Sequence, residues 1–417
     1  MEQVLNYIKD WCHKWRLLVN CEKNKTEILV IQPGKHSAYT PSPLFLGSSE
    51  IKYAEKSKVL GVYIDTKLEF REHARYVLRK CWYSWNILTE NSTRLEGAGG
   101  PALALLFRTV VLTKLLYAAP VWLKRQLSFF DDFLAKARLK ITGGQFHCSK
   151  VLSELLTMVA PLRVSLEVLD VKFILKGLTA GDTMTAKLLQ IEAEPNHPYY
   201  KGIMSVKRYL RWKGDPLVLP TPNRRHQTFL RNCSLIDVDP QTLHYSKESM
   251  EEYGYELWNE VIRNSIKSIS RTDPFTILPV HSDEELKLLV DCGALFDVPL
   301  LRRSLSRRTT TAVVDFVHGH NLRFQDFLYA QQKLNRNVHC PECLECFKPD
   351  SPFHKLFECE LGDCLVELRE QLKPISRYEH NFHLALLFNR ERKLKDVFCD
   401  LVEKVILLSS FGEELLT

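Results

Sequence analysis

The feature that most constrains the fold of this 417-residue chain is a cluster of cysteine and histidine residues in its last fifth. In the segment CPECLECFKPDSPFHKLFEC, the spacing C-x2-C-x10-H-x4-C is typical of a tetrahedral zinc site. Two thiolates with two residues between them can reach one ion, and a later His and Cys can complete the tetrahedron. Metal binding contributes about 10–16 kcal/mol to small sites of this kind, which compensates for the few apolar residues here. We therefore predict a structural zinc ion held by Cys340, Cys343, His354 and Cys359.

The choice of zinc ligands within this cluster is not unique. Cys346, Cys364 and His339 also lie within reach, and Cys343 and Cys346 form a second C-x2-C pair. Two other interpretations stay open. Reduced cysteines can gather in a segment without a metal, and C-x2-C-x2-C also occurs at iron–sulfur clusters, although the fourth Cys followed by Pro is absent here.

The size and composition of the chain are those of an ordinary globular protein with two or three domains. Lys and Arg total 57 and Asp and Glu 50, so the net charge of +7 permits a polyanionic partner without requiring one. No basic start and apolar run of a secretory signal follows Met1, so the twelve cysteines favour metal ligation over disulfides. We expect an intracellular protein, nuclear or cytoplasmic and not secreted. The most apolar stretch, 102–123, contains two cations and a proline, which predicts a buried helix and not a membrane span.

Residues 70–88 give the clearest signal of secondary structure. Apolar residues recur from Phe70 at the spacing of one helix face, which predicts a long amphipathic helix. The opposite face carries cations at Arg71, Arg75, Arg79 and Lys80. A solvated surface is the simplest interpretation of these charges. Contact with nucleic-acid phosphates is the functional alternative, because it requires several cations on one side of an element.

The rest of the chain divides into strands before this helix and further helices after it. The sequence predicts strands over 27–31, 44–46, 50–53 and 59–64. It predicts one helix before them, over 2–18, and a helix that begins at Pro101. Further helices are predicted over 128–141, 150–159 and 163–179, and within 283–330 and 365–417. Residues 183–275 have only patchy periodicity. This region contains two basic patches, 207–213 and 224–226.

The first basic patch mixes cations with aromatic residues. Arg208, Arg211 and Trp212 suit single-stranded nucleic acid, because cations contact phosphates while an aromatic ring stacks on bases. Short basic patches are also common on protein surfaces that bind nothing. Both interpretations stay open.

The carboxylates of the chain do not form a recognisable catalytic pattern. Phosphoryl transfer requires two or more carboxylates that converge on Mg²⁺. Asp131 and Asp132 open a helix and are interpreted as its N-terminal cap, and Asp65 ends a strand with only Glu69 nearby. No glycine-rich phosphate loop, Gly-x-Ser-x-Gly or His-Glu-x-x-His motif is present. We expect the chain by itself to be inactive.

The order of several short motifs is similar to that of a known family. WCHKWRLLVN from Trp11, with KTEILV from Lys25, resembles the segment after the active-site hairpin in reverse transcriptases of non-LTR (LINE-type) retrotransposons. LFLG and EI in 44–51, and KVLGVYID from Lys58, resemble the primer grip and the entry to the thumb of that family. LYAAPVW from Leu116 and LKITG from Leu139 continue the match, and FVHGH from Phe316 with the cysteine cluster resembles the C-terminal end of the same polyproteins.

The resemblance implies an α+β fold that is predominantly α-helical. Its parts are expected to be a small β palm-edge and primer-grip remnant at 1–66, a helical thumb-like domain at 67–182, an unassigned connecting region at 183–310, a zinc-knuckle-like module at 311–364 and a helical tail at 365–417. Lys58 and the helix with Arg71 and Lys80 would then face template–primer duplex, and the Cys/His module would contact RNA or DNA.

The departures from the family affect its expected activity. The catalytic Asp pair and the endonuclease of the family lie upstream of where Met1 begins, and 183–310 show no ribonuclease H acids. The resemblance therefore implies the C-terminal part of an RNA-directed DNA polymerase without its fingers and palm, with Mg²⁺ required only if the palm is supplied. The expected partners are RNA, DNA or both, without a membrane, and the oligomeric state is open. The alternatives are a domesticated, non-catalytic, zinc-dependent nucleic-acid-binding protein and a relic without function.

Overall fold

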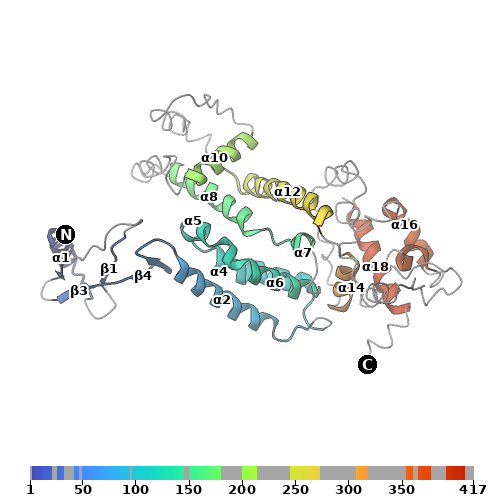
Figure 1. Ribbon diagram of the computed structural model, residues 1–417, viewed down its shortest axis with the longest axis horizontal. Helices are drawn as coiled ribbons and strands as arrows, with labels where there is room; N and C mark the ends of the chain where they lie inside the picture. Colours follow the sequence, from blue (N-terminus) through green and yellow to red (C-terminus); the bar gives the residue numbers. More distant parts are fainter. Residues whose placement is uncertain are drawn as a thin grey trace. The chain divides into compact units, whose positions relative to one another are not determined.

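The computed structural model is mostly helical with a few short strands, which confirms the α+β class and the predominance of helix (Figure 1). The chain divides into two compact units, Met1–Trp82 with Lys114–Phe130, and Tyr83–Thr113 with Asp131–Thr417. The five predicted segments stay predictions. The structure describes residues 2–20, 26–31, 42–46, 49–93, 96–144, 150–179, 200–213, 245–272, 307–317, 354–359, 365–376 and 391–408.

The first unit begins with helix α1, Glu2–Lys14, which ends four residues earlier than its apolar pattern predicts. The reason is a Schellman turn: Arg16 adopts a φ of 56°, and the backbone amides of Arg16 and Leu17 donate to the carbonyls of His13 and Cys12. The predicted apolar stripe of this helix is largely exposed, with Trp11 at 48% and Trp15 at 61%.

Three short strands follow as a small mixed sheet. Strands β1 (Glu27–Ile28), β2 (Leu44–Leu46) and β3 (Ser49–Tyr53) are ordered β1-β3-β2, with β3 parallel to β1 and antiparallel to β2. Alternate residues of β2 and β3 are buried, at Leu44, Leu46 and Ile51, as the period of a half-buried strand requires. The strands predicted at 44–46 and 50–53 are thus confirmed, and the one predicted at 27–31 is shorter.

The single strand predicted over 59–64 is wrong. Residues 56–65 form a hairpin of β4 (Lys56–Val59) and β5 (Val62–Asp65), turning at Leu60 and Gly61 with φ of 47° and 89°. Positive φ at both central residues is the geometry of a two-residue type I′ turn. Gly61 is needed there, because its φ is left-handed and an added Cβ would lie 3.3 Å from the Tyr117 ring.

Helix α2, Arg71–Thr89, has the two faces that its sequence predicts. Its apolar face is buried at Phe70, Ala74, Val77, Cys81 and Trp85. At roughly 1.5–3 kcal/mol for each large side chain, this burial is the main support of the helix.

Residues 114–130 of the first unit support both the hairpin and the start of α2. Helix α5 (Ala119–Trp122) and the 3₁₀ turns η2 (Leu123–Arg125) and η3 (Leu127–Phe130) follow Tyr117, whose hydroxyl donates to the Leu60 carbonyl at 2.8 Å. The Gln126 side chain donates to the Glu69 carbonyl at 2.8 Å. These bonds fix the hairpin tip and the turn between β5 and α2.

The helix predicted to begin at Pro101 forms, but it contains a π-helical insertion. Helices α3 (Gly100–Leu106) and α4 (Thr113–Leu116) flank the π-helix η1 (Phe107–Leu112). The wider turn matters because fully buried side chains recur here at a spacing of four, at Leu103, Phe107, Val111 and Leu115. A regular helix with 3.6 residues per turn would rotate such a row off one face, and the insertion corrects the rotation.

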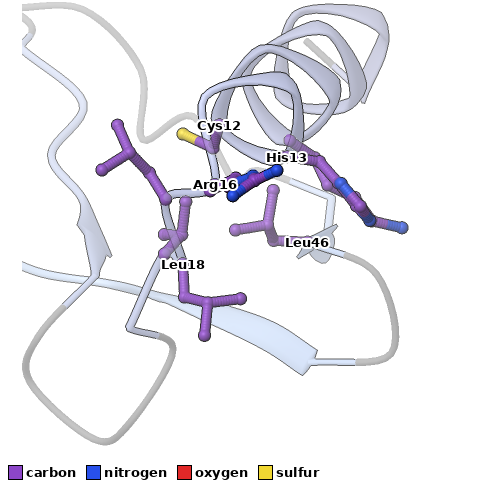
Figure 2. Close-up of a pocket in the computed structure, with 8 residues that line it drawn as sticks. Cys12, His13, Arg16, Leu18 and Leu46 are labelled. Carbon is purple, nitrogen blue, oxygen red and sulfur yellow. The ribbon is translucent and has the colours of Figure 1, made fainter.

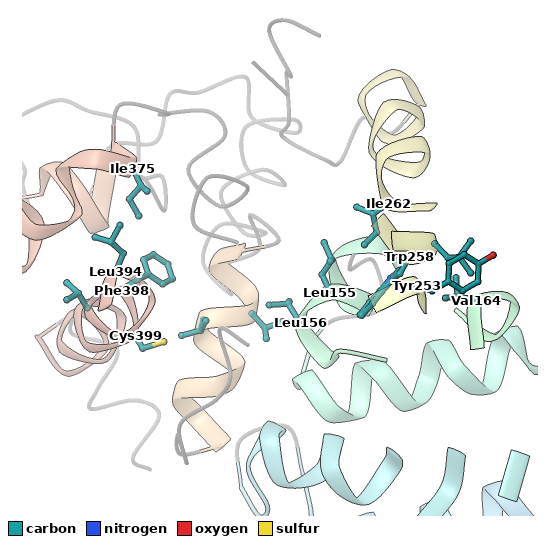
Figure 3. Packing of buried hydrophobic residues seen from close by; sticks show 14 of the residues in the cluster. Leu155, Leu156, Val164, Tyr253, Trp258, Ile262, Ile375, Leu394, Phe398 and Cys399 are labelled. Carbon is teal, nitrogen blue, oxygen red and sulfur yellow. The ribbon is translucent and has the colours of Figure 1, made fainter. Parts of the chain in front are cut away.

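The second unit is a set of helices around one apolar cluster (Figure 3). Helices α8 and α10 pack on each other, α12 packs on α8, and α14 and α16 pack on α18. Its elements are α6 (Asp131–Thr142), α7 (Lys150–Thr157), α8 (Leu162–Thr179), α10 (Tyr200–Lys213), α12 (Lys247–Thr272), α14 (Arg307–Val317), the π-turn η5 (His354–Glu358), α16 (Val366–Ser376) and α18 (Arg392–Leu408).

Most of these helices agree with the sequence predictions, but α10 and α12 lie in 183–275, where the sequence predicts no helix. The 26 residues of α12 lie in a region whose periodicity predicts no element, although Tyr253, Trp258 and Ile262 are buried in the cluster. Figure 3 shows Ile262 and Trp258 on the side of Leu155 of α7, and Tyr253 near Val164 of α8. Tertiary packing therefore stabilises a helix that its own pattern signals weakly.

Three buried charged side chains in the described part of the second unit, Arg138, Glu154 and Arg307, are paired or hydrogen-bonded. Arg138 and Glu154 form an ion pair of 3.1 Å with both side chains buried, and burial is the first cause that shifts the pKa of each toward its neutral form. The Arg307 guanidinium donates to the carbonyls of Lys140 and Ile141 at the end of α6, which have no partner within that helix.

Among the described residues, no single helix is long and apolar enough to cross a membrane. A bent pair, Gly100–Leu116 with Ala119–Arg125, meets the length and composition test, but it carries the fully buried row of Leu103, Phe107, Val111 and Leu115. This burial agrees with the prediction of a core helix over 102–123.

Candidate nucleic-acid interface

The turn between β5 and α2 is organised by Asp65. Its carboxylate accepts hydrogen bonds from the backbone amides of Lys67 and Glu69, both at 3.0 Å, and of Phe70 at 2.6 Å. These amides precede the first turn of α2, where backbone donors have no helical partner. Asp65, which we considered above as a metal ligand, thus holds the entry to the helix.

His73 of α2 links the helix to strand β5 of the hairpin. It is buried, its Nδ1 accepts the Tyr63 amide at 3.3 Å, and its ring lies edge-to-face with Trp122 at 4.7 Å between centroids. Burial first, and the charge of Lys58 second, lower the pKa of His73 to about 4. The imidazole is therefore neutral at physiological pH, and Nε2 carries its hydrogen.

The exposed face of α2 carries the predicted arginines in a row. Arg71, Arg75 and Arg79 are separated by four residues, about one helical turn or 6 Å of rise, and all three are exposed. Arg71 pairs with Glu69 at 3.3 Å and Arg75 pairs with Glu72 at 2.5 Å, on side chains that are 70% and 60% exposed. Arg79 makes no ion pair with any residue that the structure describes.

Two lysines meet at one tyrosine beside this row. The Lys58 Nζ donates to the Tyr76 hydroxyl at 3.3 Å and lies 4.9 Å from the centroid of its ring, and the Lys80 Nζ lies 4.6 Å from the same centroid. Tyr63, opposite Lys58 across the hairpin, packs edge-on against Tyr76 at 5.1 Å. Lys80 first, and then Lys58, lower the pKa of Tyr76. We call this set, with the arginine row, the hairpin–α2 surface; its members are Lys58, Tyr63, Arg71, Arg75, Tyr76, Arg79 and Lys80.

The second predicted set forms a surface on α10, which we call the α10 surface and which consists of Arg208, Arg211 and Trp212. Arg208 pairs with Glu167 of α8 at 2.6 Å, and the same carboxylate oxygen accepts from the Tyr253 hydroxyl at 3.2 Å. Trp212 is 37% exposed and packs against Tyr253 at 5.6 Å. Burial and then Glu167 raise the pKa of Tyr253, so its hydroxyl stays protonated.

Of the four predicted zinc ligands, the structure describes two. Cys340 and Cys343 lie outside the described residues, as do the alternatives Cys346, Cys364 and His339. His354 and Cys359 are both buried, at the two ends of η5, and the Cys359 amide donates to the His354 carbonyl at 2.7 Å. The His354 Nδ1 lies 3.2 Å from Glu358 Oε2. Within the described ranges, no three His, Cys, Asp or Glu side chains are arranged to hold a metal ion.

The first unit also contains a pocket of about 430 Å³ beside α1 (Figure 2). Its walls combine the basic end of the helix with apolar side chains, and Cys12, His13, Arg16, Leu18 and Leu46 are labelled there. The lining includes no carboxylate. This pocket therefore does not supply the acidic ligands that magnesium-dependent phosphoryl transfer requires.

Sequence reasoning missed Tyr76, Tyr63 and His73, on which the geometry of the hairpin–α2 surface depends. The available signal was the position of Tyr76, one helical turn before Lys80 on α2. Tyr76 and His73 both contact residues of the preceding hairpin, Lys58 and Tyr63. The sequence spacing alone could not predict this contact, because the prediction of a single strand over 59–64 did not include the hairpin that brings Lys58 to Tyr76.

Comparison with known proteins gives one informative similarity. Over 115 residues the chain is 27% identical to a retrovirus-related Pol polyprotein from the type-1 retrotransposable element R1 of Bradysia coprophila. The match covers 27% of this chain and only 11% of that polyprotein. No family model matches, and no solved structure matches. The hairpin–α2 surface thus belongs to a chain that is similar, over about a quarter of its length, to a retrotransposon polyprotein, which supports a retrotransposon-related origin.

Proposed function

We propose that this chain binds nucleic acid through the hairpin–α2 surface, as part of a retrotransposon reverse transcriptase. The observation that carries the proposal is the exposed arginine row on a helix whose opposite face is buried. Arg71, Arg75 and Arg79 present three guanidinium groups on one side, and guanidinium groups match phosphate oxygens in both charge and geometry.

The ion pairs within this row do not compete strongly with a phosphate ligand. Arg71 and Arg75 pair with carboxylates that are themselves more than 40% exposed. Exposed pairs of this kind contribute about 0–1 kcal/mol, so their exchange for phosphate contacts has little cost. Arg79 needs no exchange at all among the described residues.

The similarity to a Pol polyprotein and the family resemblance in the motifs from Trp11 to Leu139 support the polymerase context. In that context the hairpin–α2 surface would contact template–primer duplex. The alternative is a non-catalytic, zinc-dependent RNA- or DNA-binding protein. Both functions require binding, and they differ in whether nucleotide incorporation occurs when a polymerase active site is supplied. A relic would show neither.

We propose in addition that His354 and Cys359 belong to a structural zinc site with Cys340 and Cys343. The imidazole nitrogen and thiolate are donors that zinc prefers, and both described side chains are buried. Zinc would supply ligand bonds that stabilise a segment with few apolar residues. Zinc content of the purified protein, measured by emission spectroscopy, should be near one per chain and should fall with Cys343→Ala; a content near zero contradicts the site.

The test of the proposed function is a binding titration with the full chain. Labelled single-stranded RNA, single-stranded DNA and an RNA–DNA hybrid are titrated from about 50 to 200 mM salt, a range over which several phosphate contacts change affinity strongly. The test variant is Arg71→Gln with Arg75→Gln and Arg79→Gln. The control is Lys136→Gln with Lys247→Gln and Lys373→Gln, which removes the same charge from exposed lysines that pair with acids in the second unit.

We expect the wild type to bind at least one ligand with an affinity that falls with salt. The arginine variant should reduce the slope of log K against log salt by about 2–3, since each phosphate contact contributes about 0.9. The control variant should leave the slope unchanged within about 0.5. Negligible binding of the wild type at about 50 mM salt, or equal losses in the two variants, contradicts the proposal.

A further inference from the structure

We propose that Lys58 and Lys80 form a binding site for one phosphate group of the nucleic-acid backbone, and that Tyr76 is the residue that positions them. This inference rests on the proposed function and adds the atoms that would hold the phosphate. It starts from a difference among the cations of the hairpin–α2 surface. Arg71, Arg75 and the neighbouring Lys56 each have a carboxylate within 4 Å, whereas Lys58 and Lys80 have none among the described residues.

The two lysines lie close to each other because of one aromatic ring. Their Nζ atoms lie 4.9 Å and 4.6 Å from the centroid of Tyr76, so the two charges are no further apart than about one Debye length at 0.1 M salt. Cation–π attraction to the ring holds each exposed lysine there. Their mutual repulsion remains, and an anion bound near both ammonium groups would relieve it.

Chemistry identifies the anion as a phosphate. Two ammonium groups supply several donors, and the Tyr76 hydroxyl, which accepts from Lys58 at 3.3 Å, still has its own hydrogen to donate. Lysine ammonium groups and tyrosine hydroxyls are common partners of backbone phosphate oxygens. A base edge would not require two positive charges, and the nucleic-acid ligand of the proposed function carries its negative charge on phosphates.

The site is held in place before any ligand arrives. Lys58 stands on a hairpin whose tip is held by the Tyr117 hydroxyl and whose second strand is bonded to His73, while Lys80 and Tyr76 share one turn of α2. Tyr63 packs against the edge of Tyr76 and restricts its ring. Such pre-organisation reduces the entropy that binding would otherwise lose.

The test uses the full chain and a labelled single-stranded DNA and RNA–DNA hybrid. Lys58→Ala with Lys80→Ala should lower the salt slope by about 0.7–0.9, because the two cations together neutralise one phosphate. Tyr76→Leu should weaken binding about 5-fold at unchanged charge, because both lysine side chains lose the aromatic ring that positions them. Tyr76→Phe keeps the ring and should lose about 2–3-fold through the missing hydroxyl. Tyr83→Leu, at an exposed tyrosine of the same helix, is the control and should change affinity less than about 1.5-fold.

Two further measurements separate positioning from a general loss of structure. Thermal unfolding should be the same for wild type and Tyr76→Phe, and a spectroscopic titration should show one tyrosine that ionises below the ordinary range in the wild type and not in Tyr76→Phe. Inorganic pyrophosphate should compete with oligonucleotide in the wild type and less in the lysine variant, whereas free nucleoside should not compete. Competition by the nucleoside would overturn the assignment to phosphate.

The outcomes of this test differ from those of the proposed function. If the wild type binds no nucleic acid, the proposed function and this inference both fail. If the wild type binds and the arginine variant loses affinity, but the lysine variant and Tyr76→Leu match wild type, this inference alone is wrong. A Tyr76→Leu chain that does not fold leaves the decision to the lysine variant and Tyr76→Phe.

Discussion

The hairpin–α2 surface and the α10 surface have the same kind of sequence and different surroundings. Both mix cations with aromatic residues on a helix. On α10, Arg208 is neutralised by Glu167 and Trp212 packs on Tyr253, which leaves Arg211 as the member without an ion pair among the described residues. On the hairpin–α2 surface, Lys58, Arg79 and Lys80 all lack an ion pair among the described residues, and both lysines contact the Tyr76 ring. Glu167 of α8 neutralises Arg208 of α10, whereas no described carboxylate neutralises Lys58 or Lys80. A basic, aromatic pattern therefore indicates a binding surface only where the fold leaves its cations unpaired.

The largest expected effect is the loss of stability when the buried Arg138–Glu154 ion pair of the second unit is broken. Glu154→Ala leaves Arg138 buried without its partner and should lower the free energy of unfolding by about 3–5 kcal/mol. The matched change beside the hairpin–α2 surface, Glu72→Ala, removes a solvent-exposed carboxylate and should leave the free energy of unfolding nearly unchanged. Chemical denaturation measures both. Equal effects at the two positions would break the comparison.

The second effect is the pH dependence of stability that His73 contributes in the hairpin–α2 region. His73 has a pKa of about 4 in the folded chain and about 6.5 when unfolded, so the unfolded state binds more protons between these values. Stability from this group is complete above pH 6.5 and is lost as the pH falls toward 4, by at most about 3 kcal/mol. Denaturation curves from pH 7 to 4.5 should show this slope.

His73→Gln should flatten that slope, because the replacement does not titrate while its amide oxygen can still accept the Tyr63 amide. An unchanged slope in His73→Gln would assign the pH dependence to another group.

The third effect compares the two surfaces by binding. Arg79→Glu with Lys80→Glu should weaken oligonucleotide binding about 30-fold, or about 2 kcal/mol, since it replaces two phosphate contacts by repulsion. Arg211→Glu with Lys213→Glu makes the same change in charge on α10 and should weaken binding less than about 3-fold. Fluorescence anisotropy measures both variants. The reverse order of losses would make the α10 surface the principal interface.

The smallest effect tests whether the Arg208–Glu167 ion pair is the reason for weak nucleic-acid binding at the α10 surface. Glu167→Gln removes the negative charge opposite Arg208 while keeping a polar group near the Tyr253 hydroxyl. Freeing one cation should raise the affinity for oligonucleotide about 2-fold and increase the salt slope by somewhat less than 1. Glu69→Gln is the control, because Arg71 is already exposed and its pair is weak. No gain in Glu167→Gln would show that pairing is not the reason.

The sequence predicted the elements whose own periodicity is strong. The buried and charged faces of α2 follow directly from apolar residues spaced from Phe70, and the β2–β3 hairpin follows from its alternation. The β4–β5 hairpin was missed because Leu60 adopts a positive φ, which its residue type rarely signals. Helix α12 was missed because its stability depends on packing against α8 and not on its own pattern.

The candidate site was predictable only in part, for a related reason. The cations of α2 could be named because they share one helix face, and their exposure is confirmed. Which of them are neutralised could not be predicted, because Glu167 lies 41 residues from Arg208 and Tyr76 lies 18 residues from Lys58. Such pairings are fixed by tertiary structure.

The most direct measurement of the central claim is lysine footprinting of the full chain with and without bound oligonucleotide, read by mass spectrometry. The account predicts that Lys58 and Lys80 become protected from acetylation on binding, while Lys213 on α10 and Lys247 on α12 react at the same rate in both samples. Protection of Lys213, with Lys58 and Lys80 reacting equally in the free and bound chains, would contradict it.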